Sequence, residues 1–416
     1  MNRPARLREN IAALSILQAL NYAAPLITVP YLVRVLGPAC FGLLAFSQAL
    51  ILYFDAVAAY GFNFSATRAV ARCRHEPAAL AAVFWRTTYA GAALMLCGAA
   101  VLAAIVAAAP QLRSTPLLYA ASYLTVIGTA AFPVWFFQGL EQMRFIMIAQ
   151  ASARALSIPA LLVCVRHPED YIRAAAIQGG VPVLASVLAA PVLWARVPAG
   201  PPRPRASEIL QTLKDGWHVF VTQMGMVAGA ATTTVVLGLA AGSAAVGYYA
   251  AAEKVIKAVT SMLGPVAQAL YPHLSNLKGR SLELTLRTMR KSFTWIALAA
   301  FGASAVTFFL ARPIGLLLWG HGFAPSVAIL RWLSPLPFVL ALVNILGAQT
   351  MLVFGMDALL SRIILAGAAA NLVLAVALAP LFGALGAAAA TVASGALIAV
   401  CLAWSIRRKA VSLCAA

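Results

Sequence analysis

Long apolar runs separated by short polar segments dominate the sequence. A transmembrane helix needs about 20 apolar residues, and twelve runs of roughly this length can be marked. They are 11–33, 41–60, 87–109, 116–138, 146–165, 174–195, 217–239, 247–271, 292–311, 326–354, 363–381 and 386–406. The run 326–354 is long enough to predict a tilt or a kink. The pattern predicts an all-α integral membrane protein of about twelve transmembrane helices. An outer-membrane barrel is excluded, because its period-two alternation of apolar and polar residues is absent from the sequence.

The composition supports this interpretation. Of the 416 residues, 63% are hydrophobic and 10% are charged, whereas a soluble domain carries about 25% charged residues. A soluble fold of this length could not cover its surface with so few charges. A surrounding lipid phase removes that requirement, because the outside of the protein can then be apolar as well.

The formal net charge of +19 comes from 30 Lys and Arg residues. When the loops are assigned with the N-terminus inside, 21 of these residues fall in inside loops and 5 in outside loops. This bias follows the positive-inside rule and predicts that both termini are cytoplasmic, with the chain in a bacterial inner membrane. The basic excess therefore indicates membrane topology and contact with anionic lipid headgroups, and not binding to nucleic acid.

A proline- and arginine-rich stretch, RVPAGPPRPRAS at 196–207, falls near the middle of the chain. We therefore expect an N-terminal bundle of six helices over 1–195, a cytoplasmic linker over 196–214 and a C-terminal bundle over 215–416. A weak repeat supports two pseudo-symmetric halves. Leu36-Gly37 and the string FGLLA at 41–45 correspond in this interpretation to Leu237-Gly238 and VGYYA at 246–250. Duplicated halves with a site between them are frequent in transporters.

A few ionisable residues fall within the spans, where each costs at least ~2.5–3.5 kcal/mol and usually faces a cavity or a partner. Glu253 and Lys257 are four positions apart and can pair on one helix face, which leaves Lys254 without a local partner. The cationic surplus predicts a cavity that suits a phosphate or pyrophosphate. The alternative is that these side chains reach the headgroups, and this alternative is favoured for Arg331.

Four basic residues are candidates for substrate binding in that cavity: Lys254, Lys257, Arg154 and Arg34. Arg34, at the outer end of the first span, could gate the outer mouth or anchor the helix at the interface. Two acidic residues are candidates for ion coupling: Asp55 and Glu253. For Asp55, an interhelical hydrogen bond is the alternative role. Uncharged polar residues in the spans could bind sugar hydroxyls or join helices; they are Gln18, Asn21, Gln48, Asn63, Gln138, Gln268, Asn344, Gln349 and Asn371.

Enzyme signatures are absent from the sequence. GxxxxGK[ST], HExxH and GxSxG motifs do not occur, the five histidines lack metal-binding spacing, and the six cysteines contain no CxxC pair. The acidic cluster at 167–170 is too small to form a catalytic outer loop. We therefore expect no catalytic residue, metal site or cofactor.

Several strings resemble the O-antigen translocases of the polysaccharide-transporter family, within the exporter superfamily that includes multidrug and toxin extrusion proteins. The strings are NYAAPLITVPYLVRVLGPACFGLLAFSQALILYFDAVAAYGFNFSATRAVAR (21–72), PVWFFQGLEQMRFI (133–146), VGYYAAAEKVIKAVTSMLGPVAQALYPHLS (246–275), QTMLVFGMDALLSRIIL (349–365) and FGALGAAAATVAS (382–394). The positions that match the family strings include Arg34, Gly37, Asp55, Gly61, Arg68, Gly139, Glu141, Glu253, Lys254, Pro272 and Gly355.

The resemblance implies two six-helix bundles around a central cavity. It also implies that the protein flips an undecaprenyl-pyrophosphate-linked oligosaccharide from the cytoplasmic to the periplasmic leaflet by alternating access. The partners to expect are that lipid-linked substrate and the membrane lipids, with a glycan polymerase and a chain-length regulator as candidate protein partners. Two alternatives stay open: an ion-coupled small-molecule or multidrug exporter of the same superfamily, and a membrane enzyme such as a glycan polymerase.

Overall fold

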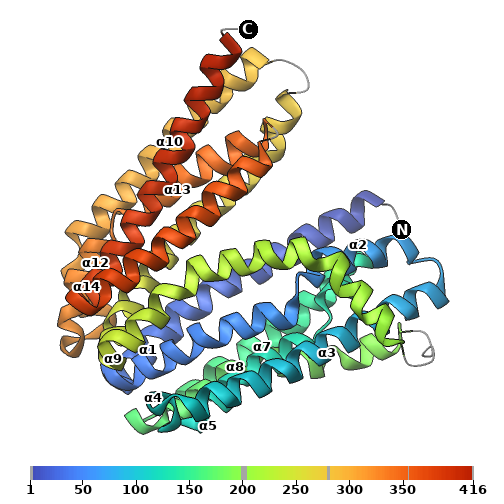
Figure 1. Cartoon of the computed structure of the whole chain (residues 1–416), viewed down its shortest axis with the longest axis horizontal. Helices are drawn as coiled ribbons and strands as arrows, with labels where there is room; N and C mark the ends of the chain where they lie inside the picture. Colours follow the sequence, from blue (N-terminus) through green and yellow to red (C-terminus); the bar gives the residue numbers. More distant parts are fainter. Residues whose placement is uncertain (1–2, 198–203, 279–281, 355, 415–416) are drawn as a thin grey trace. The chain divides into compact units, whose positions relative to one another are not determined.

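The structure, a computed structural model, describes residues 3–197, 204–278, 282–354 and 356–414 (Figure 1). Side chains are described for 24–197, 204–262, 288–289, 292–354 and 356–408. Residues 198–203 of the predicted linker and the motif position Gly355 lie outside the described residues, as does the side chain of Pro272. Over the described ranges the secondary structure is helical, without strands, which confirms the predicted all-α membrane fold.

The helices follow the predicted spans closely. They are α1 (Arg3–Ala59), α2 (Phe62–Cys73), α3 (Pro77–Ala108), α4 (Pro110–Arg113), α5 (Pro116–Ala131), α6 (Val134–Gly139), α7 (Met143–Cys164), α8 (Tyr171–Trp194), α9 (Ala206–Lys278), α10 (Leu282–Phe309), α11 (Ala311–Trp319), α12 (Ala324–Leu333), α13 (Leu336–Leu346) and α14 (Asp357–Cys414). Short turns η1 (Pro168–Asp170), η2 (His321–Phe323) and η3 (Gly347–Leu352) join some of them.

Within the described residues, nine helical segments are long and apolar enough to cross a membrane. Three of them have 50, 57 and 52 residues: the first runs from α1 through α2, and the other two lie in α9 and α14. At 1.5 Å per residue each is about 75–85 Å long, more than twice the thickness of the hydrocarbon core. Each of the three long helices therefore contains two spans, and counting them so gives the expected total of about twelve.

One glycine interrupts each long helix. Gly37 in α1 has φ 69° and ψ 175°, and Gly242 in α9 has φ 80° and ψ 177°. Gly383 in α14 has φ 57° and ψ −133°. A side chain would be strained at these angles, so a glycine can reverse the chain here between two helical spans. The glycine of α9 that matches Gly37 is thus Gly242, and the expected pairing of Gly37 with Gly238 is wrong.

Prolines mark the breaks inside two other spans. The predicted span 116–138 is divided into two helices. The first, α5, ends at Ala131, and the second, α6, has Pro133 as its N-cap. The long run 326–354 breaks between α12 and α13, where Pro335 caps α13, and then continues into the π-helical turn η3. A proline lacks a backbone donor and so interrupts the helical hydrogen bonds, which confirms the expected kink in this run.

The contacts between residues divide the chain into two compact units. Unit 1 comprises 1–36 and 47–227, and unit 2 comprises 37–46 and 228–416. Unit 1 therefore extends past the predicted linker 196–214. The second part of that linker is helical and belongs to α9, which begins at Ala206. The boundaries of the two expected bundles stay predictions.

Unit 1 packs around an aromatic core. Helix α8 lies beside α5 and α7 (Figure 1). The core gathers rings that are less than a tenth exposed, namely Tyr60, Phe62, Phe84, Phe132, Trp135, Phe136 and Phe137. Their burial removes large apolar surfaces from solvent and fixes the short helices α2 and α6 against α3 and α7.

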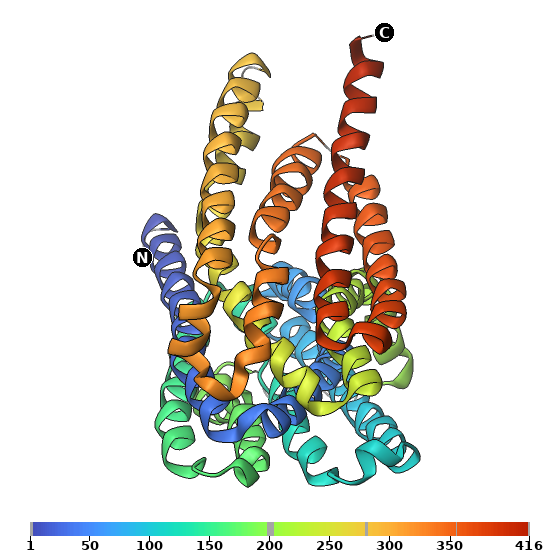
Figure 2. The same ribbon diagram turned by 90° about the vertical axis from the view of Figure 1, so that its left-hand side faces the viewer.

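Unit 2 contains a close crossing of α1 and α9. A Cβ atom on Gly42 would overlap the carbonyl of Ser243, and one on Gly247 would overlap the carbonyl of Pro38. Each of these glycines lies five residues after a kink glycine, and Pro38 and Ser243 each follow one directly. The two contacts are thus reciprocal. In the same unit, α13 lies beside α10 and α14 (Figure 2).

Candidate functional site

The second half of α9 carries three of the predicted site residues. The Nζ atom of Lys257 lies 2.9 Å from Oε1 of Glu253, which confirms the expected pairing of these two residues. The side chain of Glu253 is 16% exposed and that of Lys257 is 60% exposed. Lys254 is half-buried, and among the described residues it makes no hydrogen bond or ion pair. This helical turn therefore holds one compensated and one uncompensated positive charge.

A buried tyrosine fixes this part of α9. The hydroxyl of Tyr249 lies 3.0 Å from Oγ1 of Thr391 in α14, and the tyrosine is 1% exposed. Tyr249 is one helical turn before Glu253, so this hydrogen bond also fixes the direction in which the ion pair projects. The sequence does not reveal this bond, because Tyr249 and Thr391 are 142 residues apart.

A second hydrogen-bonded cluster joins the first half of α9 to both halves of α14. Asn371 donates to Oγ1 of Thr233 (2.9 Å) and accepts from the hydroxyl of Ser394 (3.1 Å), and all three are buried. In unit 1, Gln48 of α1 donates to Oε1 of Gln178 of α8. Gln48 and Asn371 were candidates for binding sugars or joining helices, and in the structure both join helices.

Asp55 is half-buried in α1, as expected from its position in the middle of a predicted span. Its Oδ1 atom is buried and has no hydrogen-bond partner among the described residues, and the side chain of Thr129 in α5 lies close to the carboxylate. An apolar surrounding strongly disfavours an uncompensated carboxylate. A proton or a cation would relieve that cost, and this keeps Asp55 a candidate for ion coupling.

Arg154 and Arg34 differ in their surroundings. Arg154 in α7 is half-buried, and its buried Nε atom has no hydrogen-bond partner among the described residues. Arg34 in α1 is exposed. One turn before it, the Tyr31 hydroxyl donates to the carbonyl of Val165 at the end of α7 (2.6 Å), which fixes this end of α1.

The structure brings two of the predicted site residues into direct contact, Glu253 and Lys257. The predicted site residues are divided between the two units: Arg34, Asp55 and Arg154 belong to unit 1, and the three residues of α9 belong to unit 2. The expectation that they share one cationic cavity stays a prediction.

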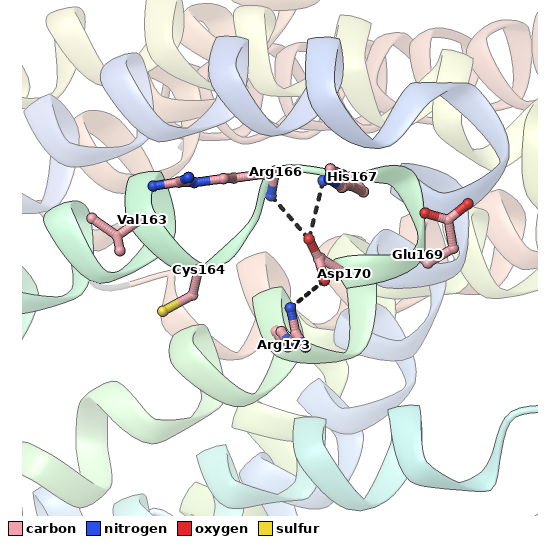
Figure 3. Close-up of a pocket in the computed structure, with 7 residues that line it drawn as sticks. All are labelled: Val163, Cys164, Arg166, His167, Glu169, Asp170 and Arg173. Atoms are coloured by element: carbon pink, nitrogen blue, oxygen red, sulfur yellow. Dashed lines mark hydrogen bonds and ion pairs between the residues drawn. The ribbon is translucent and has the colours of Figure 1, made fainter.

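The loop between α7 and α8 forms a shallow pocket (Figure 3). Asp170 accepts hydrogen bonds from the backbone N–H groups of Arg166 and His167, both at 3.0 Å, and pairs with Arg173 at 2.7 Å. The carboxylate of Asp170 is thus used to close the turn. Among the described residues, no three His, Cys, Asp or Glu side chains are placed to hold a metal ion.

The sequence is similar to transport proteins over nearly its full length. It is 28% identical over 408 residues to a protein of Escherichia coli (strain K12) named "Putative O-antigen transporter", covering 98% of each chain. A protein of the same name from Shigella dysenteriae is 27% identical and is covered to 95%, with 91% of this chain aligned.

Solved structures share the fold at low sequence identity. The lipid II flippase MurJ in an inward closed conformation gives a TM-score of 0.73 at 10% identity, with 96% of this chain and 87% of that chain covered. An inward-facing multidrug resistance MATE transporter of the MOP superfamily gives 0.71 at 15% identity, with 96% and 98% covered. These likenesses show that the chain shares the fold of these proteins. The family described as "Polysaccharide biosynthesis protein" matches residues 7–278, about two thirds of the sequence, and the chain therefore belongs to that family.

Proposed function

We propose that this protein flips an undecaprenyl-pyrophosphate-linked oligosaccharide, a repeat unit of O-antigen, capsule or exopolysaccharide, from the cytoplasmic to the periplasmic leaflet by alternating access. The observation that carries this proposal is the similarity to two proteins with the name "Putative O-antigen transporter", which extends over nearly the whole length of the chain. The membership of a polysaccharide biosynthesis family agrees with it.

The charges on α9 suit the anionic end of such a substrate. Lys254 lacks a hydrogen-bonded or ion-paired partner among the described residues, and Lys257 is compensated by a single carboxylate. Ammonium groups bind phosphate oxygens through charge-assisted hydrogen bonds, which are about twice as strong as neutral ones. In this proposal Lys254 and Lys257 bind the pyrophosphate, and Arg154 and Arg34 contribute further positive charge.

The carboxylates are the proposed coupling groups. Asp55 has a buried oxygen without a hydrogen-bond partner among the described residues, and Glu253 is largely buried against one lysine. A carboxylate in an apolar region changes its protonation when its neighbours change. Binding and release of a cation or proton at these two groups would drive the alternation between inward-open and outward-open states, with both termini in the cytoplasm and with no catalytic step.

A deletion strain without a paralogue tests the function. We expect surface glycan to be lost, lipid-linked repeat units to accumulate in the inner leaflet, and both defects to be reversed by the cloned gene. A strain that still displays full-length glycan would rule the proposal out. Sensitivity to cationic drugs with unchanged glycan would instead indicate a small-molecule exporter, and a change of glycan chain length by purified protein in detergent would indicate a polymerase.

A further inference from the structure

Helix α2 is a short amphipathic helix with two distinct faces. Its 12 residues extend for about 18 Å, too short to cross the hydrocarbon core. One face carries Phe62, Ala66 and Val70, which are buried in the core of unit 1. Val70 packs directly on Gly139 of α6, where a Cβ atom would come within 2.6 Å of the valine side chain. This face therefore fixes α2 firmly on unit 1.

The opposite face is exposed and basic. At 100° per residue, Phe64, Arg68, Ala71 and Arg72 project within one sector, directly opposite the buried residues. All four are exposed, and Phe64 is 59% exposed. The helix sequence, FNFSATRAVARC, contains no acidic residue. An exposed phenylalanine beside two unopposed arginines is the pattern of a helix that lies at a lipid–water interface.

A row of aromatic rings gives the level of α2 in the membrane. Tyr60, just before α2, stacks on Phe220 with ring centroids 4.5 Å apart, and Phe220 contacts Trp217 at 5.7 Å. Trp217 is 52% exposed at the start of the apolar run 217–239 within α9, and Trp194 is 59% exposed at the end of α8. Exposed tryptophans at the ends of membrane helices mark the level of the headgroups. Helix α2 therefore begins at this level.

We propose that the face formed by Phe64, Arg68 and Arg72 binds anionic phospholipid headgroups of the cytoplasmic leaflet. The two guanidinium groups bind the phosphates, and the ring of Phe64 inserts at the boundary between headgroups and acyl chains. The positive-inside distribution of charge assigns this end of unit 1 to the cytoplasmic side. The site concerns bulk lipid and not the transported substrate, so it stands independently of the proposed function.

Lipid titration of the purified full-length protein tests this site. Binding of phosphatidylglycerol and of phosphatidylcholine is measured by native mass spectrometry for the wild type and for Arg68→Gln/Arg72→Gln. Each surface arginine contributes roughly a factor of five in affinity, so the double variant should bind phosphatidylglycerol about 25-fold more weakly. Binding of phosphatidylcholine and the melting temperature should stay the same. Arg68→Lys/Arg72→Lys should retain most of the affinity, because the charge is kept.

Arg166→Gln/Arg173→Gln is the matched control, since it removes two positive charges from the loop after α7 and from the first turn of α8. This control should retain the wild-type affinity for phosphatidylglycerol. Two results would overturn the proposal: unchanged lipid binding by the α2 variant, which would leave its exposed face to a protein partner, or an equal loss in both variants, which would indicate charge without a specific site.

Discussion

The second halves of α1 and α9 share the same backbone geometry and differ in the charge of their side chains. In both helices a glycine at the kink, Gly37 or Gly242, is followed five residues later by a second glycine, Gly42 or Gly247. The second glycine contacts the backbone of the other helix. The repeat is therefore built from glycines, two of which are required by their positive φ angles and two by the lack of space for a side chain. A duplicated backbone can be maintained in this way while the side chains around it diverge.

The difference appears eleven residues after each kink. In α1 this position is Gln48, which makes a neutral hydrogen bond to Gln178. In α9 it is Glu253, which forms an ion pair with Lys257. The position in α1 that corresponds to Lys257 is Leu52, fifteen residues after the kink. At these two positions charge is thus confined to the second copy, where α9 carries an ion pair and α1 carries a neutral amide and a leucine.

The largest effect is expected at the shared backbone contact. Gly247→Ala and Gly42→Ala each place a methyl group against a backbone carbonyl that cannot rotate away. We expect each to lower the free energy of unfolding by about 2–3 kcal/mol, measured by equilibrium unfolding in mixed detergent.

The control for this substitution is Gly302→Ala in α10, which has open space around the added Cβ. It should be neutral or slightly stabilising, because alanine has the higher helix propensity. If Gly247→Ala is as stable as Gly302→Ala, the crossing is not closely packed in the folded protein.

The next effect concerns transport and Lys254. Lys254→Gln removes the uncompensated charge of α9, and a charge-assisted bond of about 1.5–3 kcal/mol corresponds to a loss of roughly 10- to 100-fold in transport. Surface glycan in a complemented deletion strain measures this loss, with the protein level determined in parallel. Lys214→Gln, on the same helix and exposed, is the control and should complement fully. Normal display with Lys254→Gln would remove this residue from the site.

Many features of the fold and of the candidate site could be predicted from the sequence, because they depend on residues close together along the chain. Spans are set by runs of about 20 apolar residues, and the pairing of Glu253 with Lys257 follows from their spacing on one helix. The kink in the run 326–354 follows from its length and from Pro335. These features depend on neighbours within a few residues along the chain.

Features that depend on distant contacts could not be predicted. The Leu-Gly pair at 237–238 matched the pair at 36–37 in sequence, but backbone geometry makes Gly242 the counterpart of Gly37. The contact of Gly42 with Ser243 joins segments about 200 residues apart. The same holds for Asp55 and Thr129, and for Tyr249 and Thr391, since nothing in the local pattern of either partner indicates the other.

A smaller effect should distinguish the two intramembrane amides. Asn371→Leu removes hydrogen bonds to two buried hydroxyl groups, those of Thr233 and Ser394, whereas Gln48→Leu removes one to Gln178. Hydrogen bonds between membrane helices are worth about 0.6 kcal/mol on average and up to about 1.7 kcal/mol. We expect a loss of about 1–2 kcal/mol for Asn371→Leu and about half of that for Gln48→Leu. Equal losses in equilibrium unfolding would contradict the view that α14 depends more strongly on its polar cluster.

The smallest effect should be the coupling between Glu253 and Lys257. The free energies of unfolding of Glu253→Gln, Lys257→Gln and the double variant give the interaction directly. Because the Lys257 side chain is 60% exposed, the pair should resemble an i,i+4 pair on a helix surface and contribute about 0.3–0.5 kcal/mol. The Asp170–Arg173 pair at the start of α8, measured in the same way, provides a reference. A coupling of about 2 kcal/mol or more would mean that apolar surroundings enclose the α9 pair; Lys257 would then be held by Glu253 too tightly to exchange it for a phosphate, and Lys254 would be left as the binding cation of α9.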